Sequence, residues 1–308
     1  MITLKHLRYF TALAQHRHFQ RAAEACAISQ PALSLQIKEL ETLLGAPLVE
    51  RGSRQIGLTA LGEVFEKRAR RILLEVAELS DLARAAQGRM QGTLRLGMIS
   101  TVAPYLFPPV IRRLLEEMPD LDLRPRETTT DKLIEELTAG RLDAAVMALP
   151  VSEPGLEEHF LFEEEFHLVR PAQSAGDALP FPGLLPPGMR LLLLEEGHCF
   201  REQALGYCSM KNDVAPDMLE GTSLATLVQM VEAGIGVTLI PAMAIARETA
   251  GSDVSVTRLS PPRPVRRIGM IWRASNPLSQ QFSEIAALIR AEHDRLSAGL
   301  RHGARPVA

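Results

Sequence analysis

The feature that most constrains the fold is a run without proline from Leu61 to Gly88, in which apolar residues recur at helical spacing. Successive apolar positions lie alternately four and three residues apart, the spacing of the a and d positions in a coiled coil of about three heptads. Such a helix would be roughly 40 Å long. The positions are Phe65, Ala69, Ile72, Val76, Leu79, Ala83 and Ala86.

This helix would present one apolar face for which the sequence offers no local partner. Pairing with a second copy of the chain would bury that face, so the run predicts a homodimer formed through a linker helix at 61–90. The alternative is a long helix that lies along its own protein body.

Residues 1–60 are typical of a small helical domain with a helix-turn-helix. A tight turn precedes a helix expected over 29–44, where Ser29 is a favourable N-cap and Pro31 is tolerated in the first turn. The buried stripe of this helix is expected at Leu33, Ile37, Leu40 and Leu44. Another face carries Gln30, Pro31, Ser34 and Lys38. Because the second helix of a helix-turn-helix enters the major groove by its N-terminal end, we expect these four residues to contact DNA.

A wing is expected after this helix. The turn Gly52-Ser53 is followed by the segment 54–58. Arg51 and Arg54 flank the turn and would lie near phosphates or a minor groove.

The charge of the chain is unevenly distributed, although a net charge of −3 alone argues against nucleic acid. Residues 1–90 carry 13 Lys and Arg against 9 Asp and Glu, a net of +4, whereas the remainder carries 21 against 28, a net of −7. This asymmetry favours a basic DNA-facing head on an acidic body. Solvated surfaces alone can also differ this much.

From residue 91 the pattern changes to alternating strands and helices. Short apolar runs predict strands at 94–99, 121–124, 144–149, 166–169, 191–194, 237–240 and 268–272. Helices are expected at 105–118, 130–139, 223–233 and 280–300. The alternation predicts a doubly wound α/β sheet.

Ligands in such sheets bind beyond the carboxyl ends of the strands. Ser100-Thr101 follows the first strand and Thr128-Thr129-Thr130 opens the second helix of this region, so both groups would direct hydroxyls at that crevice.

Residues 197–208 hold Cys199 and Cys208, two of the three cysteines. Cys199 follows His198 and stands two residues before Arg201, and neighbouring positive charge favours the reactive thiolate. Cys208 has no such neighbours, so Cys199 is predicted to attack and Cys208 to resolve. In one helix their Cα atoms would be about 13 Å apart, whereas a disulfide needs roughly 4.4–6.8 Å, so oxidation would force refolding. The alternative is two buried cysteines that act as small apolar side chains.

The first 60 residues resemble the DNA-binding domain of LysR-type transcriptional regulators. The matching positions are Ala22-Ala23, Ser29-Gln30-Pro31-Ala32-Leu33-Ser34, Gln36-Ile37, Leu40-Glu41, Leu44-Gly45, Leu48, Arg51, Leu58-Thr59 and Gly62. The resemblance implies an N-terminal winged helix-turn-helix, a long linker helix and a two-lobed, periplasmic-binding-protein-like α/β regulatory domain at 91–308. Lobe I would comprise about 91–162 and 268–308, and lobe II about 163–267.

The cysteine segment further resembles the peroxide-sensing branch of that family, through Glu195-Glu196-Gly197-His198-Cys199, Arg201, Gln203-Ala204, Gly206 and Cys208. The resemblance implies that peroxide oxidises Cys199 to a sulfenic acid and that Cys208 closes the disulfide. It also implies a peroxide pocket around Thr101, Thr130, His198 and Arg266. We add Arg201 as a hydrogen-bond donor, and Thr222 from the similar segment 222–227.

These observations predict a DNA-binding transcriptional regulator that senses hydrogen peroxide through a reversible Cys199–Cys208 disulfide and controls oxidative-stress genes. The expected partners are double-stranded DNA with roughly two-fold symmetric sites, further copies of the chain in a homodimer and a homotetramer, RNA polymerase if the protein is an activator, and a cytosolic thiol reductant.

Two alternatives to this function remain at the level of sequence. One is a LysR-type regulator that binds a small organic effector between its lobes and has inert cysteines. The other is a thiol peroxidase, against which the DNA-binding head weighs. A signal peptide and a membrane-spanning run are both missing from the sequence, so a cytoplasmic protein without membrane contact is expected. Neither a cofactor nor a metal site is expected.

Overall fold

The computed structural model describes residues 1–50, 56–86, 88, 90–174, 190–208 and 218–303. The chain divides into two compact units, Met1–Ala86 and Gln87–Ala308.

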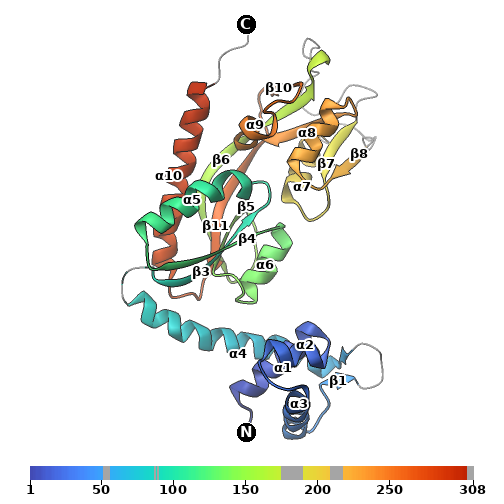
Figure 1. Cartoon of the computed structure of the whole chain (residues 1–308), viewed down its shortest axis with the longest axis vertical. Coiled ribbons are helices and arrows are strands. Elements are labelled where there is room, and N and C mark those ends of the chain that lie inside the picture. Colours follow the sequence, from blue (N-terminus) through green and yellow to red (C-terminus); the bar gives the residue numbers. More distant parts are fainter. Residues whose placement is uncertain (51–55, 87, 89, 175–189, 209–217, 304–308) are drawn as a thin grey trace. The chain divides into compact units, whose positions relative to one another are not determined.

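The N-terminal unit is a winged helix-turn-helix (Figure 1). Its elements are α1 (Leu4–His16), α2 (Phe19–Ala25), α3 (Gln30–Leu44), β1 (Val49–Glu50), β2 (Gly57–Leu58) and α4 (Ala60–Ala85). Antiparallel pairing of β1 with β2 forms the base of the wing. The turn between α2 and α3 uses Ala27 at a φ of 54°. This confirms the predicted fold of the head.

Three residues of the predicted stripe hold α3 in the core of this unit. Leu33, Ile37 and Leu40 are at most 2% exposed and pack with residues of α1 and α2. The Ser29 hydroxyl caps α3 by accepting from the Ala32 N–H (3.4 Å), and Gly45 ends the helix in the left-handed conformation. The helix is therefore fixed by packing along its length and by caps at both ends.

The linker helix α4 is packed at its start and exposed farther along. Phe65 meets Phe10 of α1 edge to face, with ring centroids 5.4 Å apart, and Ala69 is buried. In contrast, Ile72 is 44% and Leu79 63% exposed. Much of the predicted apolar seam is thus accessible in a single chain.

The C-terminal unit is built on one nine-stranded sheet, with strand order β4-β3-β5-β11-β6-β9-β7-β8 and with β10 paired to β6. The strands are β3 (Gly92–Ile99), β4 (Leu121–Thr128), β5 (Ala144–Leu149), β6 (Leu156–Pro171), β7 (Leu191–Leu194), β8 (Met218–Gly221), β9 (Val237–Pro241), β10 (Val254–Arg258) and β11 (Val265–Arg273).

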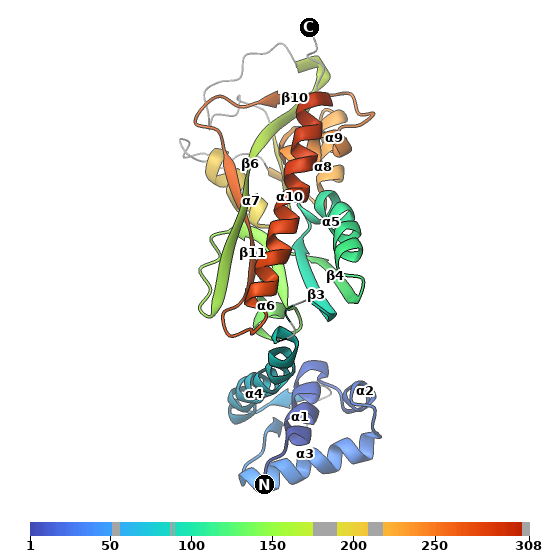
Figure 2. The same ribbon diagram turned by 90° about the vertical axis from the view of Figure 1, so that its left-hand side faces the viewer.

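Helices surround this sheet. They are α5 (Ala103–Glu117), α6 (Thr130–Thr138), α7 (Cys199–Cys208), α8 (Leu224–Glu232), α9 (Ala242–Glu248) and α10 (Ser279–Gly303), with a 3-10 turn η1 at Ala172–Ser174. Figure 2 shows α10 running along the long strands β6 and β11.

The sheet confirms the expected two-lobed α/β unit and shows that its strands are mixed in direction. β3, β4 and β5 are mutually parallel on one side, and β7, β8 and β9 on the other, but β6 and β11 pair antiparallel between them. Two parallel half-sheets joined by two long antiparallel strands form the two lobes. The carboxyl end of β3 and the start of α7 meet where the lobes face each other.

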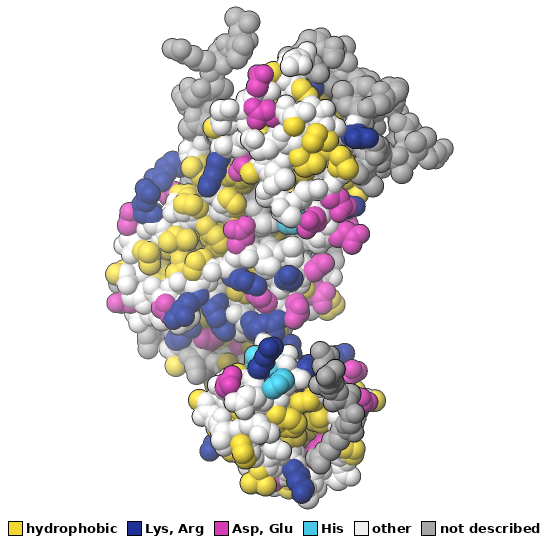
Figure 3. Space-filling view, turned by 45° about the vertical axis from the view of Figure 1, so that its right-hand side comes forward, with side chains coloured by type: hydrophobic (Ala, Val, Ile, Leu, Met, Phe, Trp, Pro, Cys, Tyr) yellow, Lys and Arg dark blue, Asp and Glu magenta, His cyan; other side chains and the backbone are white. Residues whose placement is uncertain are grey.

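Charged side chains on the C-terminal unit are largely interspersed by sign on the face seen in Figure 3. Arg95 pairs with Asp143 (2.6 Å) and Arg126 with Glu136 (3.2 Å). Such pairs neutralise arginines locally, in keeping with the acidic balance of this part of the chain.

Candidate functional site

The first wall of the site comes from the end of β3. Ile99 and Thr101 are 3% exposed, and the turn is closed by a hydrogen bond from the Val102 N–H to the Ile99 carbonyl (2.9 Å). The Thr101 hydroxyl oxygen accepts from Arg266 Nη1 at 2.7 Å, so this threonine is held from behind by a cation.

The second wall is the N-terminus of α6. Thr129 occupies the N-cap position without a side-chain capping bond, and Thr130 follows as the first helical residue. Thr130 Oγ1 is buried and has no hydrogen-bond partner in the described part of the chain. Since a buried hydroxyl without a partner is unfavourable, this oxygen is suited to a small polar guest.

The third wall is the start of α7. Gly197 has a φ of 89°, which a residue without Cβ adopts freely. It leads into His198, and the His198 carbonyl accepts from the Arg201 N–H (2.9 Å). Cys199 is then the first residue of α7 and is a free, half-buried cysteine. Its side chain therefore lies at the end of the helix that carries partial positive charge.

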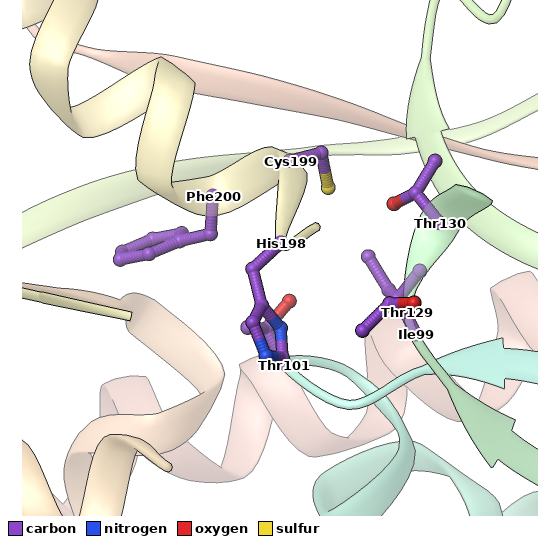
Figure 4. Close-up of a pocket in the computed structure, with 7 residues that line it drawn as sticks. All are labelled: Ile99, Thr101, Thr129, Thr130, His198, Cys199 and Phe200. Atoms are coloured by element: carbon purple, nitrogen blue, oxygen red, sulfur yellow. The ribbon is translucent and has the colours of Figure 1, made fainter. Parts of the chain in front are cut away.

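These three walls border a small pocket, whose empty space, open solvent included, is about 150 Å³ (Figure 4). Its lining consists of Ile99, Thr101, Thr129, Thr130, His198, Cys199 and Phe200. The close-up shows the Cys199 sulfur and the Thr130 hydroxyl on facing sides, with His198 and Thr101 below them. A thiol, threonine hydroxyls and an imidazole therefore converge on one small space.

The imidazole of His198 is half-buried beside this space. Burial lowers its pKa below the ordinary value, and the nearby Glu195 carboxylate opposes this in smaller measure. His198 Nδ1 lies 3.1 Å from the Ser100 hydroxyl. At neutral pH the ring is therefore uncharged, with one donor and one acceptor nitrogen.

A fully buried ion pair supports the pocket. Arg266 binds Glu164 through Nε (2.8 Å) and Nη2 (2.7 Å), and its Nη2 also donates to the Thr101 carbonyl at 3.1 Å. The second Glu164 oxygen accepts from the Met243 N–H at 2.7 Å, at the start of α9. The Arg266 guanidinium also lies over the Phe200 ring, 5.7 Å from its centroid. Because both charges are paired and hydrogen-bonded, the pair is a rigid support.

The structure brings some of the predicted site residues together and separates others. Thr101, Thr130, His198 and Cys199 line the pocket, and Arg266 stands behind Thr101. Arg201 points elsewhere, because it donates to the Leu194 carbonyl (3.1 Å) and pairs with Glu220 (2.6 Å).

Thr222 does not contribute to the pocket, because it is exposed before α8 and is not among the lining residues. Cys208 is the last residue of α7, and its side chain lies outside the described part of the structure. Sequence reasoning missed Glu164, which lies in a run of three glutamates that gives no sign of which one is buried.

The residues predicted to contact DNA lie on the accessible face of α3. Gln30, Pro31, Ser34 and Lys38 are all exposed, opposite the buried stripe. Arg51 and Arg54 fall outside the described residues. A metal site is also not indicated, because no group of three or more His, Cys, Asp or Glu among the described residues could hold an ion. No described helix is long and apolar enough to cross a membrane.

The chain combines a winged helix-turn-helix with a two-lobed α/β unit that has a pocket between its lobes. This combination is typical of transcription regulators. Comparison with protein families agrees: residues 4–63 match the bacterial regulatory helix-turn-helix protein, lysR family, and residues 87–294 match the LysR substrate binding domain. The chain belongs to the LysR family of DNA-binding transcription regulators.

Individual relatives cover nearly the whole chain. A probable hydrogen peroxide-inducible genes activator of Streptomyces viridosporus is 41% identical over 94% of this chain and 93% of its own. The DNA-binding transcriptional dual regulator OxyR of Escherichia coli K12 is 38% identical over 95% of this chain and 96% of its own length.

Solved structures show the same likeness. Full-length OxyR of Pseudomonas aeruginosa with a cysteine-to-aspartate substitution is 36% identical, with a TM-score of 0.75 over 94% of this chain and 95% of that one. A hydrogen peroxide-bound cysteine-to-serine mutant of Corynebacterium glutamicum OxyR is 33% identical, with a TM-score of 0.64. The match covers 99% of this chain and 98% of that one.

Proposed function

We propose that this chain is a transcription regulator that senses hydrogen peroxide through Cys199 and Cys208. The Cys199 thiolate attacks one peroxide oxygen, the S–O bond forms as the O–O bond breaks, and the leaving oxygen is protonated to water. The Cys208 thiol then attacks the sulfenic sulfur, a second water leaves, and the disulfide closes. A cytosolic thiol reductant restores both thiols by exchange.

The observation that carries this proposal is the Cys199 thiol at a helix N-terminus in a small, largely polar pocket. Pockets for organic ligands are lined mostly by apolar and aromatic side chains. Here only Ile99 and Phe200 are of that kind, whereas three threonines, an imidazole and a thiol make up the rest of the lining. The lining therefore favours a small hydrogen-bonding molecule such as peroxide over the organic effector considered as the alternative.

The helical state of α7 supplies the switch. Cys199 and Cys208 are the two ends of one helix, so their Cα atoms are about 13 Å apart at the usual rise. A disulfide requires roughly 4.4–6.8 Å. Closing the bond must therefore unwind α7, and we infer that this change is passed on to the DNA-binding units. We expect the refolding to extend over 197–218, of which 209–217 lies outside the described residues.

The partners follow from the N-terminal unit. The exposed face of α3 at Gln30, Pro31, Ser34 and Lys38, with Arg51 and Arg54 of the wing, would contact double-stranded DNA. Pairing of two chains through Ile72 and Leu79 of α4 would match a roughly two-fold symmetric site. We further propose a homotetramer of such dimers, contact with RNA polymerase if the protein is an activator, and action in the cytoplasm.

The proposed domain borders are 1–60, 61–90 and 91–308. Lobe I would hold about 91–162 with 268–308, and lobe II about 163–267. The long strands β6 and β11 pass between the two half-sheets and support this division.

A DNA footprint with and without peroxide tests this function, together with mass-spectrometric mapping of the thiols in the same samples. We expect the footprint to change as the Cys199–Cys208 peptide pair appears, and to revert on adding a thiol reductant. A footprint that changes while both cysteines stay reduced would instead require an effector in the pocket.

A further inference from the structure

Ser100 joins two segments that lie 98 residues apart. It occupies the turn after β3, and its hydroxyl lies 3.1 Å from His198 Nδ1 at the start of α7. The turn that contains Ser100 is closed by a hydrogen bond from the Val102 N–H to the Ile99 carbonyl. The backbone at His198 is held by a hydrogen bond from the Arg201 N–H to the His198 carbonyl. Both partners are therefore held in place before the side chains meet.

The ring of His198 needs such a partner to have a defined role. A neutral imidazole carries its proton on either nitrogen, and the hydrogen bond made by one nitrogen decides which. Burial keeps this ring uncharged near neutral pH. If Ser100 donates to Nδ1, the proton stays on Nε2, and the ring offers the pocket an N–H donor.

The proposed peroxide reaction calls for such a donor. As the sulfur of Cys199 takes one oxygen, negative charge develops on the leaving oxygen, and a pre-placed N–H stabilises it. The Thr101 oxygen already accepts from Arg266, so the side-chain cation behind the pocket is engaged by that hydroxyl, by the Thr101 carbonyl and by Glu164. The ring of His198, which lines the pocket, can supply such an N–H.

We propose that Ser100 is a positioning residue for peroxide reduction: it donates to His198 Nδ1, fixes the proton on Nε2, and holds the Nε2–H toward the leaving oxygen. This inference rests on the proposed function and adds a residue to it. Ser100 itself touches neither peroxide nor sulfur in this scheme. The thiol proton, released when the thiolate forms, is recovered in the water that leaves.

The test measures the rate constant for sulfenic acid formation at Cys199 in the full-length chain. A Cys208→Ser background lets the sulfenic acid accumulate for trapping with a dimedone probe. Into it are introduced Ser100→Ala, Ser100→Thr, His198→Ala and the double variant Ser100→Ala with His198→Ala. Ser283→Ala is the matched control, because that hydroxyl donates to the Ser279 carbonyl within α10.

We expect Ser100→Ala to slow oxidation about five- to tenfold, the value of one buried hydrogen bond. Ser100→Thr should restore most of the rate and Ser283→Ala should leave it unchanged. The double variant should be no slower than His198→Ala alone, since a residue that acts through His198 has no effect once the ring is gone. Nitrogen NMR of labelled histidine should show the proton on Nε2 in the parent and a mixture in Ser100→Ala.

Three results would overturn the inference: a Ser100→Ala rate within twofold of the parent, additive losses in the double variant, or the parent proton on Nδ1. Failure of the proposed function looks different. In that case the Cys208→Ser parent itself forms no sulfenic acid with peroxide, whatever stands at position 100.

Discussion

The helices α3 and α7 carry the residues proposed to act in each unit, yet they are held in place very differently. α3 spans fifteen residues, with Leu33, Ile37 and Leu40 at most 2% exposed and with caps at both ends. α7 spans ten, and only Phe200 and Ala204 are fully buried among its described side chains. Gln203 Oε1 is also buried there and has no hydrogen-bond partner among the described residues.

The difference matches the two proposed tasks. A DNA-reading helix must keep its shape whether or not the cell is oxidised, so a full apolar stripe is useful there. A helix that has to open for a disulfide to close must be only marginally favoured, and few core contacts together with an unsatisfied buried amide achieve this. The contrast leads to four experiments, taken from the largest expected effect to the smallest.

Replacing Cys199 by Ser should abolish the peroxide response entirely, because a hydroxyl cannot be oxidised along the sulfur series. Binding of the reduced form to DNA should remain, since α3 is untouched. The readout is a footprint titrated with peroxide. Cys208→Ser is the companion variant: it should form the sulfenic acid but fail to lock the change. A Cys199→Ser protein that still shifts its footprint would remove the sensor role of α7.

Leu40→Ala should destabilise the N-terminal unit by about 2–5 kcal/mol, because it opens a cavity in the core of α3. Leu35→Ala is the matched control on the same helix, at a position that is 64% exposed. The urea midpoint and the affinity for DNA should both fall in Leu40→Ala and barely change in Leu35→Ala. The rate of Cys199 oxidation should be the same in both, which would show that the two units are independent in this respect.

Gly206→Ala should stabilise the reduced, helical form of α7 by about 1 kcal/mol, because alanine has the higher helix propensity. The disulfide form requires the helix to open, so the midpoint potential should rise by about 20 mV. Titration in glutathione buffers measures this. Glu202→Ala is the matched control, because Glu202 is exposed on the same helix. Glutamate and alanine both favour the helix, so this substitution should change the midpoint potential much less. Equal shifts in both variants would mean that α7 does not unwind.

Acid should destabilise the C-terminal unit through two half-buried histidines. Burial lowers the pKa of both His198 and His167 from the ordinary value of 6.5. Below that value the unfolded chain binds protons that the folded rings refuse, so the free energy of unfolding falls as the pH drops from 7 toward 5. Urea midpoints across this range should show a shallower pH slope in His198→Gln and in His167→Gln. An unchanged slope in both would contradict the assignment.

Much of the fold can be predicted from local sequence pattern. The spacing of apolar residues indicates α3, α4 and most strands, and glycine or proline marks where many of them end. Elements with weak patterns were missed. α9 has seven residues, β8 and β10 are short, and the first part of β6 is rich in exposed charge. The antiparallel course of β6 and β11 is a property of long-range pairing, which no single segment encodes.

The candidate site was also predictable only in part. Cys199, His198 and the threonines could be identified from the sequence, because their residue types and positions suit the chemistry. The orientation of a long side chain could not be predicted: Arg201 is near Cys199 in sequence, but it binds Glu220 and the Leu194 carbonyl instead. Glu164 and Ser100 acquire their roles only when segments about 100 residues apart come together.

The length of α7 also has a consequence for timing. In the proposed mechanism, oxidation at one end of the helix and locking at the other are separated by the opening of nearly three helical turns. During that interval a sulfenic acid exposed to cellular thiols can be returned to the thiol before any signal is sent. Opening of α7 and loss of the sulfenic acid to thiols would compete, so the spacing between the two sulfurs would set the fraction of oxidised chains that reaches the disulfide.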